Sequence, residues 1–593
     1  MIFGKHINRY YLRYAPMLLL GLLTLVAVDY LQLIIPELYK LVVDGMFAGS
    51  VTLDGVTHAF DMEFLLDRVC MPMVAVILCV CLGRFLWRVC FFGSSILLEA
   101  NLRSKMFDRA RFLSREYYQV NKVGNLMSLF TNDLDTVQEC FGWGVMMFCD
   151  AILMGILAVS KMWRLDGLMT VLSLIPMALL LCSATVVGRY MTKKWDIRQA
   201  AFSQLSDFSQ ESFSGIAVIK AFVKEAKELW AFKKLNQENE VASMAHTKAS
   251  VLFRVMVTMF VESVICIILG YGGYLVHEDV LNAGQLLEFT GYFNSVIWPI
   301  MAVSELIDMS SRGKASLARI SELLDAPVAV KDRDSVQDLP PVQGRIEFRN
   351  MTFRYPDGEF DALEDVSFVI EAGEQVGLVG KTGSGKTTLV DLILRTYNVP
   401  DGTLLIDGHD VNDVTIRSLR EACAYVPQDN FLFSDTIENN IAFGVDAHKI
   451  SAVRHAATMA DVDSNIKEFS QGYGTVLGER GVTVSGGQKQ RISIARALMK
   501  DAPILILDDS VSAVDTKTER TILENLRATR SGKTTILIAH RISTIESMDK
   551  VLFIDNGRLA AFGRHEELYT TCKEYRKMVD LQKLEEEGGE HNA

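Results

Sequence analysis

The sequence predicts a multidomain protein in which an all-α transmembrane domain of six helices is followed by an α/β domain. Two observations predict this division of the 593 residues. Long apolar runs recur before about residue 325, and each is long enough to cross a bilayer as a helix. After about residue 344, short apolar strands alternate with helical segments, which is typical of a parallel α/β domain. A chain of this length is also too long for one hydrophobic core.

The predicted spans are joined by connections of very different length. The six apolar runs cover residues 16–45, 70–98, 141–163, 167–189, 250–277 and 284–308. The connections 99–140 and 190–249 are long, polar and rich in Lys and Arg. Because an excess of these residues marks the cytoplasmic side, we expect both termini in the cytoplasm and spanning helices that continue out of the bilayer. The basic and aromatic start, residues 5–14, predicts a short amphipathic helix on the membrane surface.

Charge and cysteine usage exclude some classes of protein. The net charge is −12 and no basic stripe is present, so we expect no nucleic-acid partner. The six spans argue against a soluble ATPase that acts on DNA or ribosomes. The ten cysteines show no metal-ligand spacing, and we interpret them as packing residues in a reducing or membrane setting.

A glycine-rich loop lies between an apolar strand, residues 375–379, and a helix, residues 388–394. Its residues are Gly380, Lys381, Thr382, Gly383, Ser384, Gly385, Lys386 and Thr387, and Thr388 opens the helix. The glycines let backbone N–H groups surround phosphate, and the helix N-terminus adds a favourable dipole. Lys386 can reach the β- and γ-phosphates, and the Thr387 hydroxyl can ligate Mg²⁺. The loop therefore predicts binding of ATP with Mg²⁺.

A second apolar strand, residues 504–507, ends at Asp508, which can hold Mg²⁺. The next position should carry the carboxylate that polarises the attacking water. It is Asp509, whose side chain is one methylene shorter than that of the glutamate expected there. We therefore expect a site that binds nucleotide better than it cleaves it, which implies a partner chain.

Several further motifs resemble those of ABC transporters. Val484-Ser485-Gly486-Gly487-Gln488 resembles the signature motif, with Val in place of the usual Leu; Tyr355 resembles the aromatic residue that stacks on adenine, Gln428 the Q-loop glutamine, Ser512-Ala513-Val514-Asp515 the D-loop, and His540 the switch histidine. The resemblance implies that Asp509, His540 and Gln428 take part in hydrolysis. It also implies that Gln428 joins Thr387 and Asp508 around the metal.

The resemblance covers essentially the whole chain and implies a half-transporter of the type IV exporter fold. The implied parts are a transmembrane domain at 1–325, a linker at 326–343, a nucleotide-binding domain at 344–583 and an acidic tail at 584–593. Two segments, near 131–137 and 211–217, resemble the intracellular loops of the family, so coupling helices are expected there.

The family resemblance also implies a second chain. In this family the signature motif closes on ATP that is held by the other subunit. With Asp509, the chain resembles the subunit of heterodimeric bacterial multidrug exporters that supplies the Walker motifs of a degenerate site. Its intact signature would complete the consensus site of a second ABC half-transporter. A slow homodimer, in which Asp509 still works, is the alternative.

The cargo and the direction of transport stay open at this stage. We expect ATP-driven export of amphipathic small molecules, lipids or peptides across a bacterial inner or plasma membrane. An importer built on the exporter fold, as in siderophore uptake, is the first alternative. A non-transporting, regulatory ATP-binding subunit is another.

Ionisable residues inside the predicted spans are candidates for contact with cargo, because a charge that faces lipid is costly. Asp29, Asp150, Glu262, Glu305 and Asp308 all lie within or at the end of a span. A cavity for cationic or amphipathic cargo would explain Glu262 and Glu305. A place at a helix end in the headgroup region is the alternative, which we favour for Asp29 and Asp308.

Overall fold

The computed structural model describes residues 3–53, 56–478, 481, 483–512, 514–539 and 541–590, and it divides the chain into two compact units. The helical unit consists of Met1–Arg111 and Gly124–Asp325. The α/β unit consists of Phe112–Val123 and Ala326–Ala593. A short piece of the connection between the second and third spans is therefore part of the α/β unit.

The helical unit contains the predicted spans. Over the described residues, six helical stretches are long and apolar enough to cross a membrane: Ala15–Ala48, Met62–Ala110, Val123–Leu165, Gly167–Ser214, Glu225–His277 and Ala283–Asp325. They are built from α2 (Ala15–Gln32), α3 (Ile34–Ala48), α4 (Met62–Phe64), η1 (Leu65–Cys70), α5 (Met71–Ala110), α7 (Val123–Ser128), η2 (Leu129–Asp133), α8 (Leu134–Glu139), η3 (Cys140–Gly144), α9 (Val145–Leu165), α10 (Gly167–Ser214), α12 (Glu225–His277) and α13 (Ala283–Asp325). The predicted six-helix architecture is confirmed.

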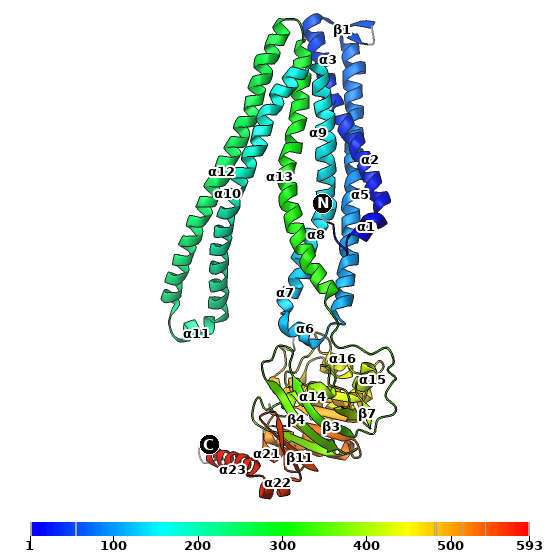
Figure 1. The fold of residues 1–593 in the computed structure, drawn as a ribbon, viewed down its shortest axis with the longest axis vertical. Helices are drawn as coiled ribbons and strands as arrows, with labels where there is room; N and C mark the ends of the chain where they lie inside the picture. Colours follow the sequence, from blue (N-terminus) through cyan, green and yellow to red (C-terminus); the bar gives the residue numbers. More distant parts are fainter. Residues whose placement is uncertain are drawn as a thin grey trace. The chain divides into compact units, whose positions relative to one another are not determined.

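Two of the spans form one long hairpin. Helices α10 and α12 lie side by side in Figure 1, and the short helix α11 (Ile216–Ala221) joins their ends. At 1.5 Å per residue, the 48 residues of α10 extend over about 70 Å, more than twice the thickness of a bilayer core. The expectation that spanning helices continue well beyond the bilayer is met by this pair.

The segment near 131–137 is not a separate coupling helix, which corrects the expectation from the sequence. It lies inside the long stretch Val123–Leu165, within η2 and α8. Leu134 and Val137 are fully buried, and the Asp133 carboxylate accepts hydrogen bonds from Arg319 of α13. The segment is thus packed into the helical unit itself. The short helix of this connection that belongs to the α/β unit is α6 (Arg115–Val120).

The predicted amphipathic start of the chain forms a short helix, α1 (Asn8–Arg13), just before the first span. It is held through His6, whose side chain is buried. Lys105 donates to His6 Nδ1 over 3.1 Å, because an ammonium group can only donate. The ring proton therefore sits on Nε2 and is donated to Asp325 over 3.1 Å. His6 thus links the start of the chain to the ends of α5 and α13.

The α/β unit is built on two sheets. The six-stranded sheet has the order β12-β11-β5-β10-β9-β8, and the four-stranded sheet has the order β4-β3-β6-β7. The larger sheet is parallel except for β12, and the smaller one is antiparallel. The strands are β3 (Ile346–Arg354), β4 (Asp361–Ile370), β5 (Gln375–Val379), β6 (Leu404–Ile406), β7 (His409–Asp410), β8 (Cys423–Val426), β9 (Ile504–Asp508), β10 (Thr534–Ile538), β11 (Lys550–Asp555) and β12 (Arg558–Gly563). A hairpin of β1 (Ser50–Leu53) and β2 (Val56–Ala59) belongs to the helical unit.

The larger sheet is buried on both faces, because side chains alternate between two hydrophobic cores along each strand. In β9, Ile504 and Ile506 join the core shared with the smaller sheet. Leu505 and Leu507 join the core shared with the helices. This explains why the strand has a continuous apolar sequence. Besides α6, the helices of this unit are α14 (Lys386–Ile393), α15 (Ile416–Glu421), α16 (Ile437–Ala442), α17 (Ile450–Met459), α18 (Asp463–Glu468), α19 (Gly486–Lys500), α20 (Thr516–Thr529), α21 (Ile542–Ile545), α22 (His565–Thr571) and α23 (Lys573–Glu590), and η4 (Gly472–Gly474) is a 3₁₀ turn.

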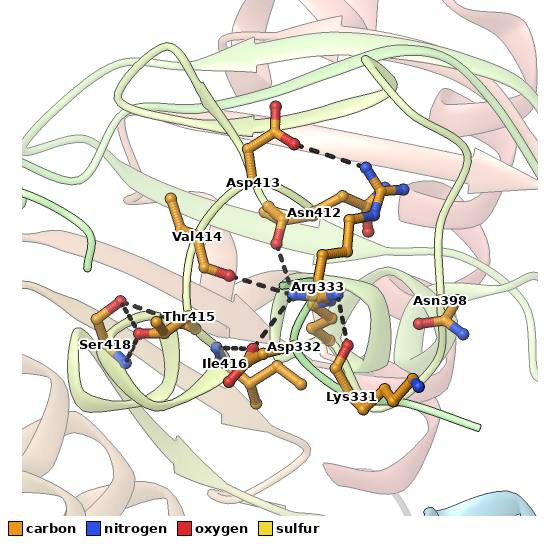
Figure 2. A network of polar contacts seen from close by, with 12 residues as sticks. Lys331, Asp332, Arg333, Asn398, Asn412, Asp413, Val414, Thr415, Ile416 and Ser418 are labelled. Atoms are coloured by element: carbon orange, nitrogen blue, oxygen red, sulfur yellow. Dashed lines mark hydrogen bonds and ion pairs between the residues drawn. The ribbon is translucent and has the colours of Figure 1, made fainter. Parts of the chain in front are cut away.

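The segment expected to be a linker is docked on the α/β unit around Arg395. Figure 2 shows this network. The Arg395 side chain is 2% exposed and donates to the carbonyl groups of Val411, Val414 and Lys331. The Asp332 carboxylate accepts a hydrogen bond from the backbone N–H of Ile416 over 2.8 Å. The start of the second unit is therefore fixed by hydrogen bonds to the buried guanidinium of Arg395 and to the backbone of Ile416.

Candidate functional site

The glycine-rich loop runs from β5 to α14, as the sequence predicts. Three of its glycines, Gly380, Gly383 and Gly385, have positive φ. A Cβ atom on Gly380 would lie 2.2 Å from the carbonyl oxygen of Ile554, and one on Gly385 would lie 2.7 Å from that of Ala362. These two positions require glycine both for backbone conformation and for space.

The side chains of the loop differ in exposure. Lys381 and Thr382 are exposed at its tip, whereas Ser384 and Lys386 are buried. Lys386 Nζ donates to the carbonyl groups of Gly380 and Lys381 over 2.8 and 2.9 Å. Burial lowers the pKa of Lys386, while the carboxylates of Asp508 and Asp509 oppose this. The loop thus holds a buried cation next to two carboxylates.

Asp508 ends β9 and is buried at 2% exposure. Burial raises its pKa, a hydrogen bond from Thr387 opposes this, and the nearby carboxylate of Asp509 adds to it. Asp508 Oδ2 and Ser384 Oγ are both buried without a hydrogen-bond partner in the described part of the chain. A carboxylate oxygen and a hydroxyl in that condition fit a divalent cation and a phosphate, respectively.

Asp509 follows directly and has a left-handed backbone with φ of 47°. Its N–H donates to the carbonyl of Ile538 over 3.0 Å. Its own carbonyl accepts hydrogen bonds from Gln490 and from Ser512, each over 3.0 Å. The backbone that carries the predicted catalytic carboxylate is therefore fixed by three hydrogen bonds.

Tyr355 follows β3 directly and lies beside the start of α14. Its hydroxyl is 2.9 Å from that of Thr388, and its ring makes edge contacts with Phe353 and Tyr397 at centroid distances of 5.2 Å. The ring is half-buried, so one part of it remains accessible next to α14. This is where an aromatic residue could stack on a bound base.

The other predicted hydrolysis residues follow neighbouring strands of the large sheet. Gln428 is exposed and comes two residues after β8, the strand that pairs with β9. His540 comes shortly after β10 in sequence, but it lies outside the described residues. Because the carboxyl ends of parallel strands share one edge, the loops after β5, β8 and β9 gather on the same side of the sheet.

The signature motif forms the start of α19. Ser485 is the N-cap, and its hydroxyl accepts a hydrogen bond from the N–H of Gln488, whose side chain accepts one from the N–H of Ser485. Ser485 and Gly486 are exposed, and a Cβ atom on Gly486 would meet no atom within 4 Å in the described part of the chain. Gly487 is the second residue of the helix. The exposed N-terminus of a 15-residue helix is suited to bind an anion.

One ion pair at this site is not predicted by the sequence. Arg115 of α6 lies 2.5 Å from the carboxylate of Asp391 in α14, the helix that begins at Lys386. The Asp391 side chain is 4% exposed. Burial raises the pKa of Asp391, and Arg115 opposes this. A carboxylate on a buried helix face could have signalled that a cation must come from elsewhere in the chain.

These features define a class of protein: a bundle of membrane-spanning helices fused to an ATP-binding unit with a phosphate loop. The comparisons with known proteins agree with it. Residues 18–300 match the family model for the ABC transporter transmembrane region, and residues 363–512 match that for ABC transporter.

Relatives match nearly the full length of the chain. It is 35% identical to the probable multidrug resistance ABC transporter ATP-binding/permease protein YheI of Bacillus subtilis, with 99% of this chain and 98% of that protein covered. It is also 35% identical to the multidrug resistance-like ATP-binding protein MdlA of Escherichia coli, with 95% and 93% covered. An ATP-dependent lipid A-core flippase of Syntrophus aciditrophicus is 34% identical, with 84% and 82% covered.

A solved structure of a bacterial Atm1-family ABC exporter with ATP bound is similar over 97% of this chain and 99% of that one, with a TM-score of 0.78 and 27% identity. The chain therefore belongs to the ABC transporter family, with a membrane domain and an ATP-binding domain fused in one polypeptide of the exporter fold. It is a multi-pass membrane protein that couples ATP to transport.

Proposed function

We propose that this chain is one subunit of a heterodimeric exporter that moves amphipathic small molecules, lipids or peptides, and that its own ATP site is the weakly hydrolytic one. Asp509 carries this proposal. A carboxylate that orients and activates water must reach it, and loss of general-base assistance costs about 10²–10⁴ in rate.

The fixed backbone of Asp509 strengthens the argument. A shorter side chain could be compensated if the backbone moved toward the water. Here the N–H is bonded to Ile538 and the carbonyl to Gln490 and Ser512. Such a movement would break hydrogen bonds at both ends of the residue. The carboxylate of Asp509 therefore cannot reach as far toward the attacking water as that of a glutamate.

The site is otherwise suited to bind nucleotide. Lys386 would neutralise phosphate charge, the loop N–H groups and Ser384 would bind phosphate oxygens, and the Tyr355 ring would stack on adenine. Thr387 and Asp508, with Gln428, would hold Mg²⁺, which when bound supplies positive charge that stabilises the transferring phosphoryl group. The unpartnered oxygens of Asp508 and Ser384 support this arrangement.

The signature motif points to a second subunit. Ser485 and Gly486 are exposed at the helix N-terminus, and no contact within 4 Å among the described residues explains why residue 486 is glycine. Close approach of a nucleotide held by another chain would explain it. The motif of this chain would then complete the consensus site of the partner, whose own glutamate activates water.

Alternating access would follow from the shared nucleotides. ATP that is bound between two chains favours the closed pair by its higher affinity for that state, and hydrolysis removes the bias. The names of the relatives include multidrug resistance proteins and a lipid A-core flippase, which supports amphipathic cargo and export. With the basic connections in the cytoplasm, both termini would face that side.

The experiment is a mass and turnover measurement on the purified chain in lipid nanodiscs. We expect no stable homodimer with normal activity, and an ATP turnover below the roughly 1–10³ s⁻¹ typical of enzymes. A stable homodimer that hydrolyses ATP and pumps solute within that range would contradict the proposal and favour the symmetric alternative.

A further inference from the structure

The helical unit contains a polar cavity of about 490 Å³ between α2, α5, α9 and α13. Its chemistry is unusual for a membrane-spanning region. Asp29, Arg84 and Asp150 line it, together with the indole rings of Trp143 and Trp298. Ionisable residues inside a span are costly and mark functional sites by default.

Asp29 is the residue whose environment is incomplete. It is 2% exposed, and its Oδ2 has no hydrogen-bond partner within the described ranges. A buried carboxylate oxygen without a donor is unfavourable in an apolar medium, and more so when the carboxylate is charged. The oxygen borders a cavity that is large enough for a small organic group.

The carboxyl of Asp150 lies within hydrogen-bonding reach of that of Asp29, so the two carboxyls can share one proton and carry one negative charge between them. Asp150 accepts a hydrogen bond of 2.6 Å from the indole N–H of Trp298. Arg84 donates to Gln32 over 3.1 Å. The guanidinium of Arg88 lies 5.4 Å from the ring centre of Trp87. The charge of Arg84 acts on both Asp29 and Asp150, but among the described residues neither Arg84 nor Arg88 donates a hydrogen bond to the buried oxygen of Asp29.

We propose that this cavity binds the protonated amino group of an amphipathic amine, with Asp29 as the acceptor of its N–H. A cation with N–H groups satisfies the carboxylate oxygen, and the nearby tryptophan rings favour a cation by their negative faces. A neutral alcohol would satisfy the hydrogen bond without the charge. The inference rests on the proposed export function, for which it names the class of substrate.

The test is equilibrium binding to the full-length chain in lipid nanodiscs. The probes are dansylcadaverine, a primary amine, and 5-(dansylamino)pentan-1-ol, its matched alcohol. We expect Asp29→Asn to weaken binding of the amine by about tenfold or more, since a charge-assisted hydrogen bond is lost, and to leave the alcohol unchanged. Asp29→Glu should keep the preference for the amine.

Asp308→Asn is the matched control, because the Asp308 side chain is 67% exposed and pairs with Arg312 outside the cavity. It should change neither affinity. The proposal is overturned if Asp29→Asn binds the amine as tightly as the wild type, or if Asp308→Asn weakens it equally. If Asp29→Asn does not fold, loss of the amine preference in Asp29→Glu would overturn it instead. ATP-driven efflux is measured separately, so a chain that binds amines without exporting them contradicts the proposed function alone.

Discussion

The guanidinium of Arg115 lies 2.5 Å from the carboxylate of Asp391, across 276 residues of sequence. Arg115 comes from the connection between the second and third spans, and Asp391 comes from the helix that starts with Lys386. The pair therefore links a segment next to the membrane domain with the helix that would carry the phosphates.

Loss of Arg115 should destabilise the α/β unit. In Arg115→Ala the buried carboxylate of Asp391 loses its cation, and we expect a cost of about 1–3 kcal/mol. The half-exposed position of Arg115 keeps the value below that of a fully buried pair. Thermal loss of nucleotide binding by the full chain measures it. The double variant Arg115→Ala/Asp391→Asn should lose less than the sum of the single variants; strict additivity would show that the pair contributes nothing.

The Arg115–Asp391 pair also predicts that the loss of stability in Arg115→Ala depends on pH. Burial already raises the pKa of Asp391, and removal of Arg115 should raise it further. A carboxyl whose folded pKa exceeds its unfolded value stabilises the fold when protonated and loses that contribution as the pH rises through the folded pKa. The penalty of Arg115→Ala should thus be larger at about pH 8 than at about pH 5. An equal penalty at both values would contradict this electrostatic explanation.

Arg395 should be essential for folding of the α/β unit. It supplies donors to three backbone carbonyls, and Arg395→Met would leave them without these donors, at a cost of about 3 kcal/mol or more. Arg333→Ala is the control, since its ion pairs with Asp401 and Asp413 are exposed to solvent and should contribute little to stability. Thermal inactivation of nucleotide binding compares them. Similar losses of thermal stability in Arg395→Met and Arg333→Ala would contradict a larger contribution from the buried hydrogen bonds.

The strands and motifs of the ATP site could be predicted, because their information is local. The apolar strand before Gly380 and the one before Asp508 are the observed β5 and β9. The glycine spacing then fixes the loop between strand and helix. Contacts between distant segments could not be predicted in this way. In the sequence, Arg115 is only one of several basic residues in the connection 99–140. Its pairing with Asp391 follows from the packing of α6.

The neighbours of ionisable residues in the predicted spans could not be predicted from the sequence either. Glu262 and Glu305, for which a cargo cavity was one of two interpretations, are both exposed in the described chain, and that interpretation stays a prediction. Asp29, which was expected nearer a helix end, is instead 2% exposed at the polar cavity. A sequence gives the polarity of each residue in a span but not the neighbour that its helix face meets. The segment 131–137 was misjudged for the same reason, since its apolar residues pack inward.

Asp509→Glu should activate the site of this chain. The longer side chain restores the missing reach, and we expect ATP cleavage there to rise by about tenfold or more. The left-handed backbone of residue 509 makes glutamate slightly less favourable, by about 1 kcal/mol. Vanadate trapping of a photoreactive ATP analogue on this chain measures the rate. Asp509→Asn, the control, should change it little; a large fall in the control would show that Asp509 already works as a base.

Gly486→Ala should separate folding from assembly. The added methyl group meets no atom of the residues that the structure describes, and alanine is the better helix former, so thermal stability should be unchanged or slightly higher. ATP-driven association with a second chain should be lost, because the methyl group would block close approach of the nucleotide. Cross-linking with and without ATP checks this. Association that persists at the wild-type level would argue against use of the signature between chains.

The phosphate loop and the signature motif of this chain are proposed to serve two different ATP sites. A comparison of one variant in each motif tests this proposal. ATPase activity is measured for the native complex that carries either Ser485→Ala or Lys386→Ala in this chain. We expect Ser485→Ala to lower the ATPase activity by about tenfold or more, because it removes a hydrogen-bond donor from the partner's active site. We expect Lys386→Ala to lower it less. Equal losses from the two variants would contradict the account and indicate two equivalent sites.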